Sequence, residues 1–127
     1  MKLFKNVNFW VISSIIALIL VAWAFIPKPI STDLEMIGNG QSSVVFIYDP
    51  NLVVSNQQAT EMKSAREMIG EQANFLLVRA GDPTTDDFKN EYQARSTDLL
   101  FFNGDGKLVE RQAAVLNAEA LIEKVTD

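Results

Sequence analysis

The apolar positions of this chain form one long block near the N-terminus and several short blocks after it. The long block, Phe9 to Ile26, has eighteen residues without a charge, and its only hydroxyl side chains are Ser13 and Ser14. At about 1.5 Å per residue, a helix of this length covers about 27 Å, which is close to the hydrocarbon thickness of a bilayer. Trp10 and Trp23 lie near its two ends, where aromatic side chains favour the membrane interface. The pattern predicts a single-pass transmembrane helix.

The charged residues around this block indicate its orientation. Lys2 and Lys5 precede it, so the positive-inside rule places the N-terminus in the cytoplasm. Pro27-Lys28-Pro29 then ends the helix and starts a stiff, extended exit, and we assign residues 1–30 to the anchor and this linker. The rest of the chain is expected to lie on the opposite side of the membrane.

A cleaved signal peptide is the alternative interpretation of the same block. Ala22-Trp23-Ala24 fits a small-x-small cleavage site, and a short basic region precedes the apolar residues. However, the block is longer than the usual signal core of about 7–15 residues, and it continues through Phe25 and Ile26 past that site. We therefore favour the anchor, and both interpretations export the domain.

The first short block, Val44 to Tyr48, consists of consecutive β-branched and aromatic residues. Such a run without alternation predicts a strand buried on both faces, and we expect it to be the central strand. Asp49-Pro50-Asn51 ends it, because proline lacks a backbone donor and Asp and Asn favour turns. Ser55 and Gln58 have the spacing of a capping box, which predicts a helix from about Gln57 to Ile69.

The later blocks continue the alternation of strands and helices. Apolar runs, turn residues and helical spacing predict a strand at Ala73–Ala80, a helix from Asp86 to about Arg95, a strand at Asp98–Phe102, a hairpin turn at Asn103-Gly104-Asp105-Gly106, an antiparallel strand at Lys107–Val115 and a helix at Ala118–Val125 behind an Asn117 cap. Phe46 and Leu77 are expected in the core of adjacent central strands. Residues 31–41 form a lead-in segment that the pattern leaves open between a short strand and a helical turn. The fold class is therefore α/β, with a mixed sheet and the order βαβαββα.

Composition excludes several classes of function. The chain has no Cys and no His, so it offers no thiol nucleophile, no thiolate metal site and no side chain that normally titrates near neutral pH. From Ser31 onward there are eight Lys and Arg against sixteen Asp and Glu, a net charge of −8. This charge argues against a nucleic-acid partner. We predict no cofactor.

The order of elements from Ser42 to Asp127 resembles the minimal thioredoxin fold. The run VVFIYDP followed by a turn and a helix is similar to the active-site strand of that family, and YQARSTDLLFFNGDGKLV is similar to its second half. The resemblance is greatest to the membrane-anchored, exported thioredoxin-like proteins of bacteria. It implies an anchor in a bacterial inner membrane, with the domain facing the periplasm or the cell exterior. It implies one thioredoxin-like domain at residues 42–127, with its functional edge at the carboxyl end of the central strand.

The residues that give this family its redox activity are absent. The chain has Val53-Val54-Ser55-Asn56 where the family carries Cys-x-x-Cys, and thiol–disulfide exchange requires a thiolate. Leu52 takes the place of the family's tryptophan, and Ser96-Thr97-Asp98 takes the place of its cis-proline loop. The resemblance therefore implies a redox-inactive protein rather than an enzyme.

Two groups of acidic residues are candidates for other chemistry. Asp82, Asp86 and Asp87 could bind a hard cation, but acids in the first turn of a helix are stabilised by its dipole, and the calcium-loop spacing is missing. Asp49 and Asp98 could form a carboxylate pair at the strand ends, but no third group supports acid–base catalysis there. We expect neither a metal site nor a catalytic residue.

The partner surface is expected where the fold brings two loops to one edge. We predict that a protein partner contacts Leu52, Val53, Val54, Asn56, Ser96, Thr97 and Asp98. Alternatively, the three apolar residues pack inward against Phe88 or Tyr92. The sequence favours a non-catalytic, membrane-tethered interaction module, such as an accessory subunit or assembly factor of a membrane or periplasmic complex. An exported peptide-binding, chaperone-like domain is the alternative, and an enzyme of non-thiol chemistry is the least favoured.

Overall fold

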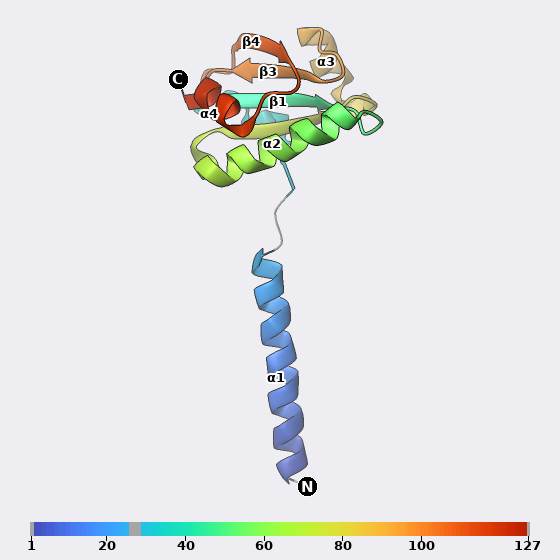
Figure 1. Cartoon of the computed structure of the whole chain (residues 1–127), viewed down its shortest axis with the longest axis vertical. Helices are drawn as coiled ribbons and strands as arrows, with labels where there is room; N and C mark the ends of the chain where they lie inside the picture. Colours follow the sequence, from blue (N-terminus) through green and yellow to red (C-terminus); the bar gives the residue numbers. More distant parts are fainter. Residues whose placement is uncertain (1, 26–28, 127) are drawn as a thin grey trace.

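The computed structural model of the chain describes residues 2–25 and 29–126 (Figure 1). Its first element is the helix α1, Lys2–Phe25. The 19 residues Val7–Phe25 are apolar enough to cross a membrane, and none of them is buried. This helix is consistent with a membrane anchor or a signal sequence. The predicted end of the apolar block at Ile26 and the exit at Pro27 and Lys28 lie outside the described residues.

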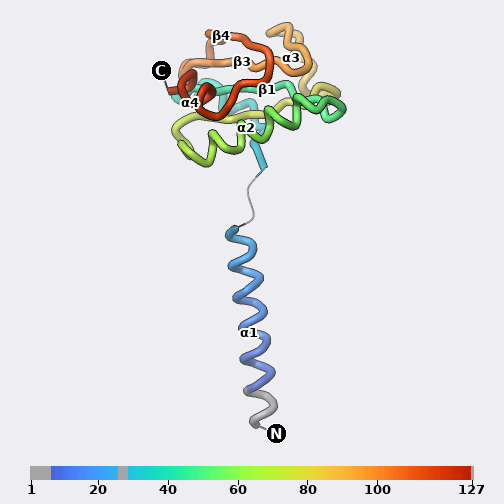
Figure 2. The backbone as a smooth tube through the Cα atoms, in the orientation of Figure 1, coloured from blue at the N-terminus to red at the C-terminus, as the bar shows by residue number. Residues whose placement is uncertain are grey.

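A four-stranded mixed sheet forms the centre of the domain (Figures 1 and 2). Its strands, in the spatial order β2-β1-β3-β4, are β1 (Ser43–Tyr48), β2 (Asn74–Arg79), β3 (Asp98–Phe102) and β4 (Leu108–Ala113). β1 pairs in parallel with β2 and antiparallel with β3, and β3 pairs antiparallel with β4. The prediction that β1 is the central strand is confirmed, because it is paired along both edges.

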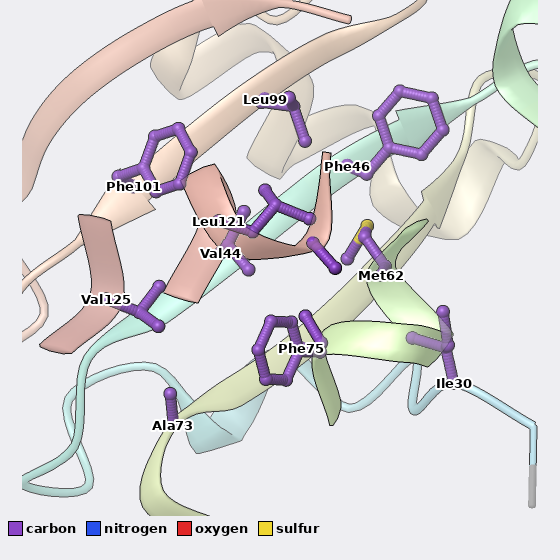
Figure 3. Close-up of a cluster of buried hydrophobic side chains, with 12 residues drawn as sticks. Ile30, Val44, Phe46, Met62, Ala73, Phe75, Leu99, Phe101, Leu121 and Val125 are labelled. Atoms are coloured by element: carbon purple, nitrogen blue, oxygen red, sulfur yellow. The ribbon is translucent and has the colours of Figure 1, made fainter. Parts of the chain in front are cut away.

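Different helices cover the two faces of the sheet. α2 (Val53–Ile69) and α4 (Ala118–Thr126) pack on one face, and α3 (Asp86–Tyr92) packs on the other (Figure 1). Successive residues of a strand point to opposite faces, so Val44 and Phe46 of β1 enter the cluster beneath α2 and α4 (Figure 3). Both side chains are fully buried. This cluster is the larger part of the hydrophobic core.

The second face buries the other half of β1. Val45 and Ile47 are buried there, beneath the aromatic side chains of α3. The ring of Tyr92 lies 5.1 Å from that of Phe102, and the ring of Phe88 lies 6.1 Å from it, centroid to centroid. The prediction of a strand buried on both faces is confirmed.

The lead-in segment, residues 31–41, belongs to the packed domain. Ser31 forms an isolated parallel bridge with Leu76 of β2, and a 3-10 helix follows at Leu34–Met36. Ile30, just before the segment, is 9% exposed and joins the cluster beneath α2. The segment thus contains both an extended contact and a helical turn, the two conformations that its pattern left open.

The hairpin turn at residues 103–106 packs closely against this lead-in segment. Asn103 Oδ1 accepts hydrogen bonds from the backbone N–H groups of Asp105 and Lys107, each at 3.0 Å, which confirms the predicted turn. Gly40 N donates to Gly104 O at 3.0 Å. A Cβ atom on Gly104 would lie 2.7 Å from Gly40 O, so a glycine is needed at this approach of two backbones.

The predicted start of α2 behind a Ser55–Gln58 capping box is wrong. The helix begins at Val53, with Leu52 at the N-cap position and no side-chain cap bond. Ser55 Oγ instead accepts a hydrogen bond from Asp49 N at 3.0 Å, so the serine closes the preceding turn. The tertiary position of the strand end therefore determines what this serine binds.

Two other predicted elements are longer than the observed ones. α3 ends at Tyr92 rather than near Arg95, because Gln93 has a φ of 50°, in the left-handed region where an α-helix does not continue. The returning strand β4 covers Leu108–Ala113 rather than Lys107–Val115. The residues after β4 instead reach the functional edge described below.

Leu77 is only partly buried, in contrast to its predicted core position. It packs against the cluster beneath α2, but Phe46 on the neighbouring strand is fully buried. Among the apolar residues of β2 the exposure is confined to this position, because Phe75, Leu76 and Val78 of the same strand are buried.

Candidate functional site

Three chain segments meet at the carboxyl end of β1. They are the turn after β1 (residues 49–52), the loop before β3 (residues 96–98) and the segment after β4 (residues 114–116). Thr97 N donates to Ile47 O at 2.8 Å, which fixes the loop to the end of β1. Ala114 N donates to Thr97 O at 3.0 Å, which fixes the third segment to the loop. The first two segments are those that the sequence analysis expected at one edge.

Hydrogen bonds to Asp49 shape the turn after β1. Asp49 Oδ1 accepts from Asn51 N at 3.0 Å, and Asp49 O accepts from Leu52 N at 3.1 Å. Together with the bond from Asp49 N to the buried Ser55, these contacts reverse the chain and start α2 at Val53. The residues in place of the Cys-x-x-Cys motif therefore form the first turn of a helix.

Apolar side chains are exposed at this edge. Val53 is 73% exposed and Leu52 is 39% exposed, whereas Val54 is half-buried. Val115 in the third segment is 41% exposed. We call Leu52, Val53 and Val115 the apolar edge.

The alternative that these residues pack against Phe88 or Tyr92 is wrong for Leu52 and Val53. Phe88 and Tyr92 stack on each other at 4.9 Å between ring centroids and pack against the second face of the sheet. Leu52 and Val53 belong to neither buried cluster of the described residues. Their side chains are therefore available to solvent.

The loop before β3 is held by its own polar groups. Asp98 Oδ2 accepts from Arg95 N at 2.9 Å and lies 3.7 Å from Arg111 Nη1. Thr97 is half-buried, with a φ of 71°, and Ser96 is exposed. Both backbone groups of Thr97 are already hydrogen-bonded, so the loop presents mainly the side chain of Ser96.

Asn56 is also hydrogen-bonded within the domain. Its Oδ1 accepts from the hydroxyl of Tyr48 at 2.7 Å, and its backbone carbonyl accepts from Thr60 Oγ1 at 3.0 Å. The bond to Tyr48 ties the end of β1 to the first turn of α2. Asn56 therefore stabilises the edge, although it remains exposed at the surface.

The acidic candidates form local contacts rather than a reactive centre. Thr84 donates to Asp82 Oδ1 from its Oγ1 at 2.7 Å and from its backbone N at 2.9 Å, and these hydrogen bonds lower the pKa of Asp82. Asp86 forms an ion pair with Lys89 at 3.2 Å. Within residues 2–25 and 29–126, no group of three or more His, Cys, Asp or Glu could hold a metal ion.

A polar cleft lies beside the apolar edge, at the carboxyl ends of the parallel strands β1 and β2. Its lining residues are Asp49, Pro50, Asn51, Arg79, Ala80, Gly81 and Asp82. These side chains include no hydroxyl, thiol or imidazole nucleophile. Asp49 accepts a hydrogen bond from Asn51 N and Asp98 accepts one from Arg95 N, so the two acids considered as a carboxylate pair each bind nearby backbone.

Sequence reasoning missed the segment that carries Val115. The sequence analysis assigned Val115 to the end of the strand Lys107–Val115. Nothing in the pattern of that strand indicated that its last residues would lie near the start of α2. Buried Gln58 makes hydrogen bonds with both backbone groups of Leu116 and holds the segment there. A glutamine among the buried positions of a helix was the available signal, because a buried amide requires partners.

The comparisons with solved structures show a thioredoxin-like fold. No protein-family model and no curated protein matches the sequence. A thioredoxin-like protein from Clostridium perfringens superposes with a TM-score of 0.68 at 12% identity, covering 80% of this chain and 82% of the other. Chloroplastic thioredoxin z gives a TM-score of 0.65 at 11% identity, covering 80% and 95%.

A third similar structure is the pneumococcal exposed lipoprotein thioredoxin Etrx1 from Streptococcus pneumoniae strain TIGR4. Its TM-score is 0.62 at 13% identity, covering 69% of this chain and 85% of the other. These identities establish the fold and not the activity. Because the chain has no cysteine, it cannot perform the dithiol chemistry of thioredoxins itself.

Proposed function

We propose that this protein is a non-catalytic, membrane-tethered interaction module that serves as an accessory subunit or assembly factor of a membrane or periplasmic complex. The observation that carries this proposal is the exposure of Leu52 and Val53 where the thioredoxin family places its active-site tryptophan and thiols. Exposed apolar side chains that gather at one place commonly mark contact surfaces. Thiol–disulfide exchange is not available to a chain without cysteine.

The apolar edge forms the centre of the proposed contact. Protein interfaces have apolar centres and polar rims, and the exposed Ser96, in the loop fixed to the end of β1, provides a polar group for the rim. The other predicted contact residues stabilise this edge. They are half-buried or hydrogen-bonded within the domain and comprise Val54, Asn56, Thr97 and Asp98.

The proposed tether is α1, with the N-terminus in the cytoplasm and the domain outside the inner membrane. Its support is the apolar span Val7–Phe25 and the lysines that precede it. The pneumococcal thioredoxin is described as an exposed lipoprotein, which offers a parallel for a thioredoxin fold held at a cell surface. The intact mass of the membrane-extracted protein tests the tether. We expect the full-length mass, whereas a chain that begins at Phe25 would identify a cleaved signal peptide.

The contact is tested in cells by placing a photo-crosslinking amino acid at position 115 and measuring the protein adducts that it forms. Replacing Val53 with Asp should lower the yield of protein adducts several-fold, because a buried contact would then desolvate a carboxylate. The fold should be retained, since an acid in the first turn of a helix is favoured by its dipole. Met68→Asp, at the other end of α2 and 59% exposed in the parent, is the matched control.

Two outcomes would contradict this assignment. Parental adduct yield from a folded Val53→Asp variant would place the contact elsewhere, and unfolding of that variant would mean that the first turn of α2 is packed inward.

An insulin reduction assay tests separately the proposal that the protein is not catalytic. Activity above a blank without protein would refute it.

A further inference from the structure

A second groove lies at the opposite end of α2, where the chain enters the domain. Its wall includes Pro29, Arg66 and Glu67, and Glu71 and Phe75 lie farther along it. Its volume is about 690 Å³, within the range of sites that bind small molecules. The groove shares no lining residue with the apolar edge.

The chain length between α1 and this groove is short. Pro29 follows Phe25 by four residues, and a fully extended chain covers at most about 3.6 Å per residue, or about 14 Å. The headgroup region of a bilayer is about 5–7 Å thick on each side. With α1 in the membrane, Pro29 must therefore lie in the headgroup region or directly above it.

The rim of the groove is attached to the domain. Arg66 Nη1 donates to Pro29 O at 2.8 Å, which links α2 to the incoming chain. The next residue, Ile30, is buried, and Ser31 accepts a hydrogen bond from Leu77 N at 2.9 Å. The position of Pro29 near the membrane therefore also sets the position of the groove.

The charges of the groove match a zwitterion with a primary amine. Arg66 provides a positive charge near Pro29, and exposed carboxylates are provided by Glu67, the next residue of α2, and by Glu71, which follows the helix. A carboxylate accepts hydrogen bonds from a primary ammonium, but a quaternary ammonium has no N–H to donate. Recognition of quaternary ammonium commonly uses several aromatic faces, and among the described residues only Phe75 contributes an aromatic side chain to this groove.

Anionic lipids fit this site less well. The chain from Ser31 onward has a net charge of −8, so it repels an anionic membrane surface over short distances. A basic peptide segment from a neighbouring membrane protein is also disfavoured, because segments on the outer side carry few Lys and Arg. A zwitterionic headgroup avoids both difficulties.

We propose that the groove beside Pro29 binds the headgroup of a phospholipid with a primary amine, phosphatidylethanolamine being the test case. The inference rests on the proposed membrane tether. The phosphate lies toward Arg66, and the ammonium lies toward Glu67 and Glu71. Each exposed ion pair contributes little by itself, but a tethered groove meets headgroups at a high effective concentration. Headgroup binding would hold the domain upright on the membrane and keep the apolar edge clear of it.

Hydrogen–deuterium exchange of the full-length protein in lipid nanodiscs tests this proposal. We expect amide exchange in residues 66–75 to be about two- to fivefold slower with phosphatidylethanolamine present than in pure phosphatidylcholine. The double variant Glu67→Gln and Glu71→Gln should lose this difference. The double variant Glu119→Gln and Glu123→Gln makes the same change of charge on α4 and should keep it.

Equal exchange rates in the two lipids would overturn the headgroup assignment, and so would equal protection by phosphatidylglycerol. Protection that occurs only in native membranes would assign the groove to a protein segment instead. Failure of the tether is distinguishable from these results, because a protein cleaved before Phe25 would show the shorter mass and would not remain in the nanodisc.

Discussion

The side chain of Gln58 in α2 holds both backbone groups of Leu116, 58 residues later in the chain. Gln58 Nε2 donates to Leu116 O at 2.9 Å, and Leu116 N donates to Gln58 Oε1 at 2.7 Å. Gln58 is fully buried, so its amide has no water to replace these partners. The pair fixes the segment that carries Val115 against the start of α2, and thereby assembles the apolar edge.

Replacing Gln58 with Met should destabilise the domain. Methionine has a similar length but no hydrogen-bonding amide, so it leaves the N–H and C=O of the half-buried Leu116 without their partners. A fully buried group without a partner costs about 1–3 kcal/mol, and these groups should cost that much or less. Denaturant unfolding measures the loss, and Gln57→Met at the neighbouring exposed position is the control. Equal unfolding midpoints for the two variants would show that water readily replaces Gln58.

Replacing Gly104 with Ala should destabilise the contact between the hairpin and the lead-in segment. The new Cβ would lie 2.7 Å from Gly40 O, so the two backbones must separate and weaken the Gly40–Gly104 hydrogen bond. Overpacking of this kind costs about 1–3 kcal/mol. Gly81→Ala is the matched control, because its Cβ would meet nothing within 4 Å. A loss of stability of the same size in both variants would contradict the steric explanation.

Truncation of Phe46 should cost more stability than truncation of Leu77. Phe46 is fully buried in the central strand, so Phe46→Ala should cost about 3–5 kcal/mol, a large part of the stability of a small domain. Leu77→Ala should fall at or below the lower end of the usual range of about 2–5 kcal/mol, because this side chain is partly exposed on an edge strand. Urea midpoints of the two variants check the ranking. A larger loss of stability for Leu77→Ala than for Phe46→Ala would mean that the exposed edge of β2 is covered in solution.

The ion pair between β4 and α4 should appear in the pH titration. Lys124 Nζ donates to Glu110 Oε1 at 2.8 Å and to Oε2 at 2.9 Å, and these bonds, followed by one from Gln112, lower the pKa of Glu110. A lowered folded-state pKa stabilises the fold above the unfolded-state pKa, and this contribution is lost as pH falls through the folded-state pKa. Lys124→Met should raise the pKa of Glu110 toward its ordinary value in an NMR titration. An unchanged titration midpoint in that variant, with Lys107→Met as control, would contradict the assigned cause.

The apolar pattern predicted most of the fold because it reports local geometry. The strand Asp98–Phe102 has the predicted bounds, and the buried central strand and the hairpin turn were also predicted correctly. Each of these features depends on neighbours within a few residues, such as the run of β-branched side chains at Val44–Tyr48 or the Asn-Gly pair in the turn. The absence of Cys likewise excludes thiol chemistry in any fold that this chain could adopt.

Contacts between distant residues decided the rest. Ser55 has the spacing of a helix cap, but the end of β1 offers it the backbone N–H of Asp49, and α2 therefore begins four residues before the predicted Gln57. Val115 enters the candidate site because β4 returns beside β3 and Gln58 binds the next residue, Leu116. The sequence by itself determined the elements, the apolar N-terminal helix and the missing redox motif. Only the tertiary structure decided which polar groups are hydrogen-bonded to each other and which apolar side chains stay exposed. The physical reason is that a buried hydrogen-bonding group binds the partner that folding brings near it, at any separation along the chain.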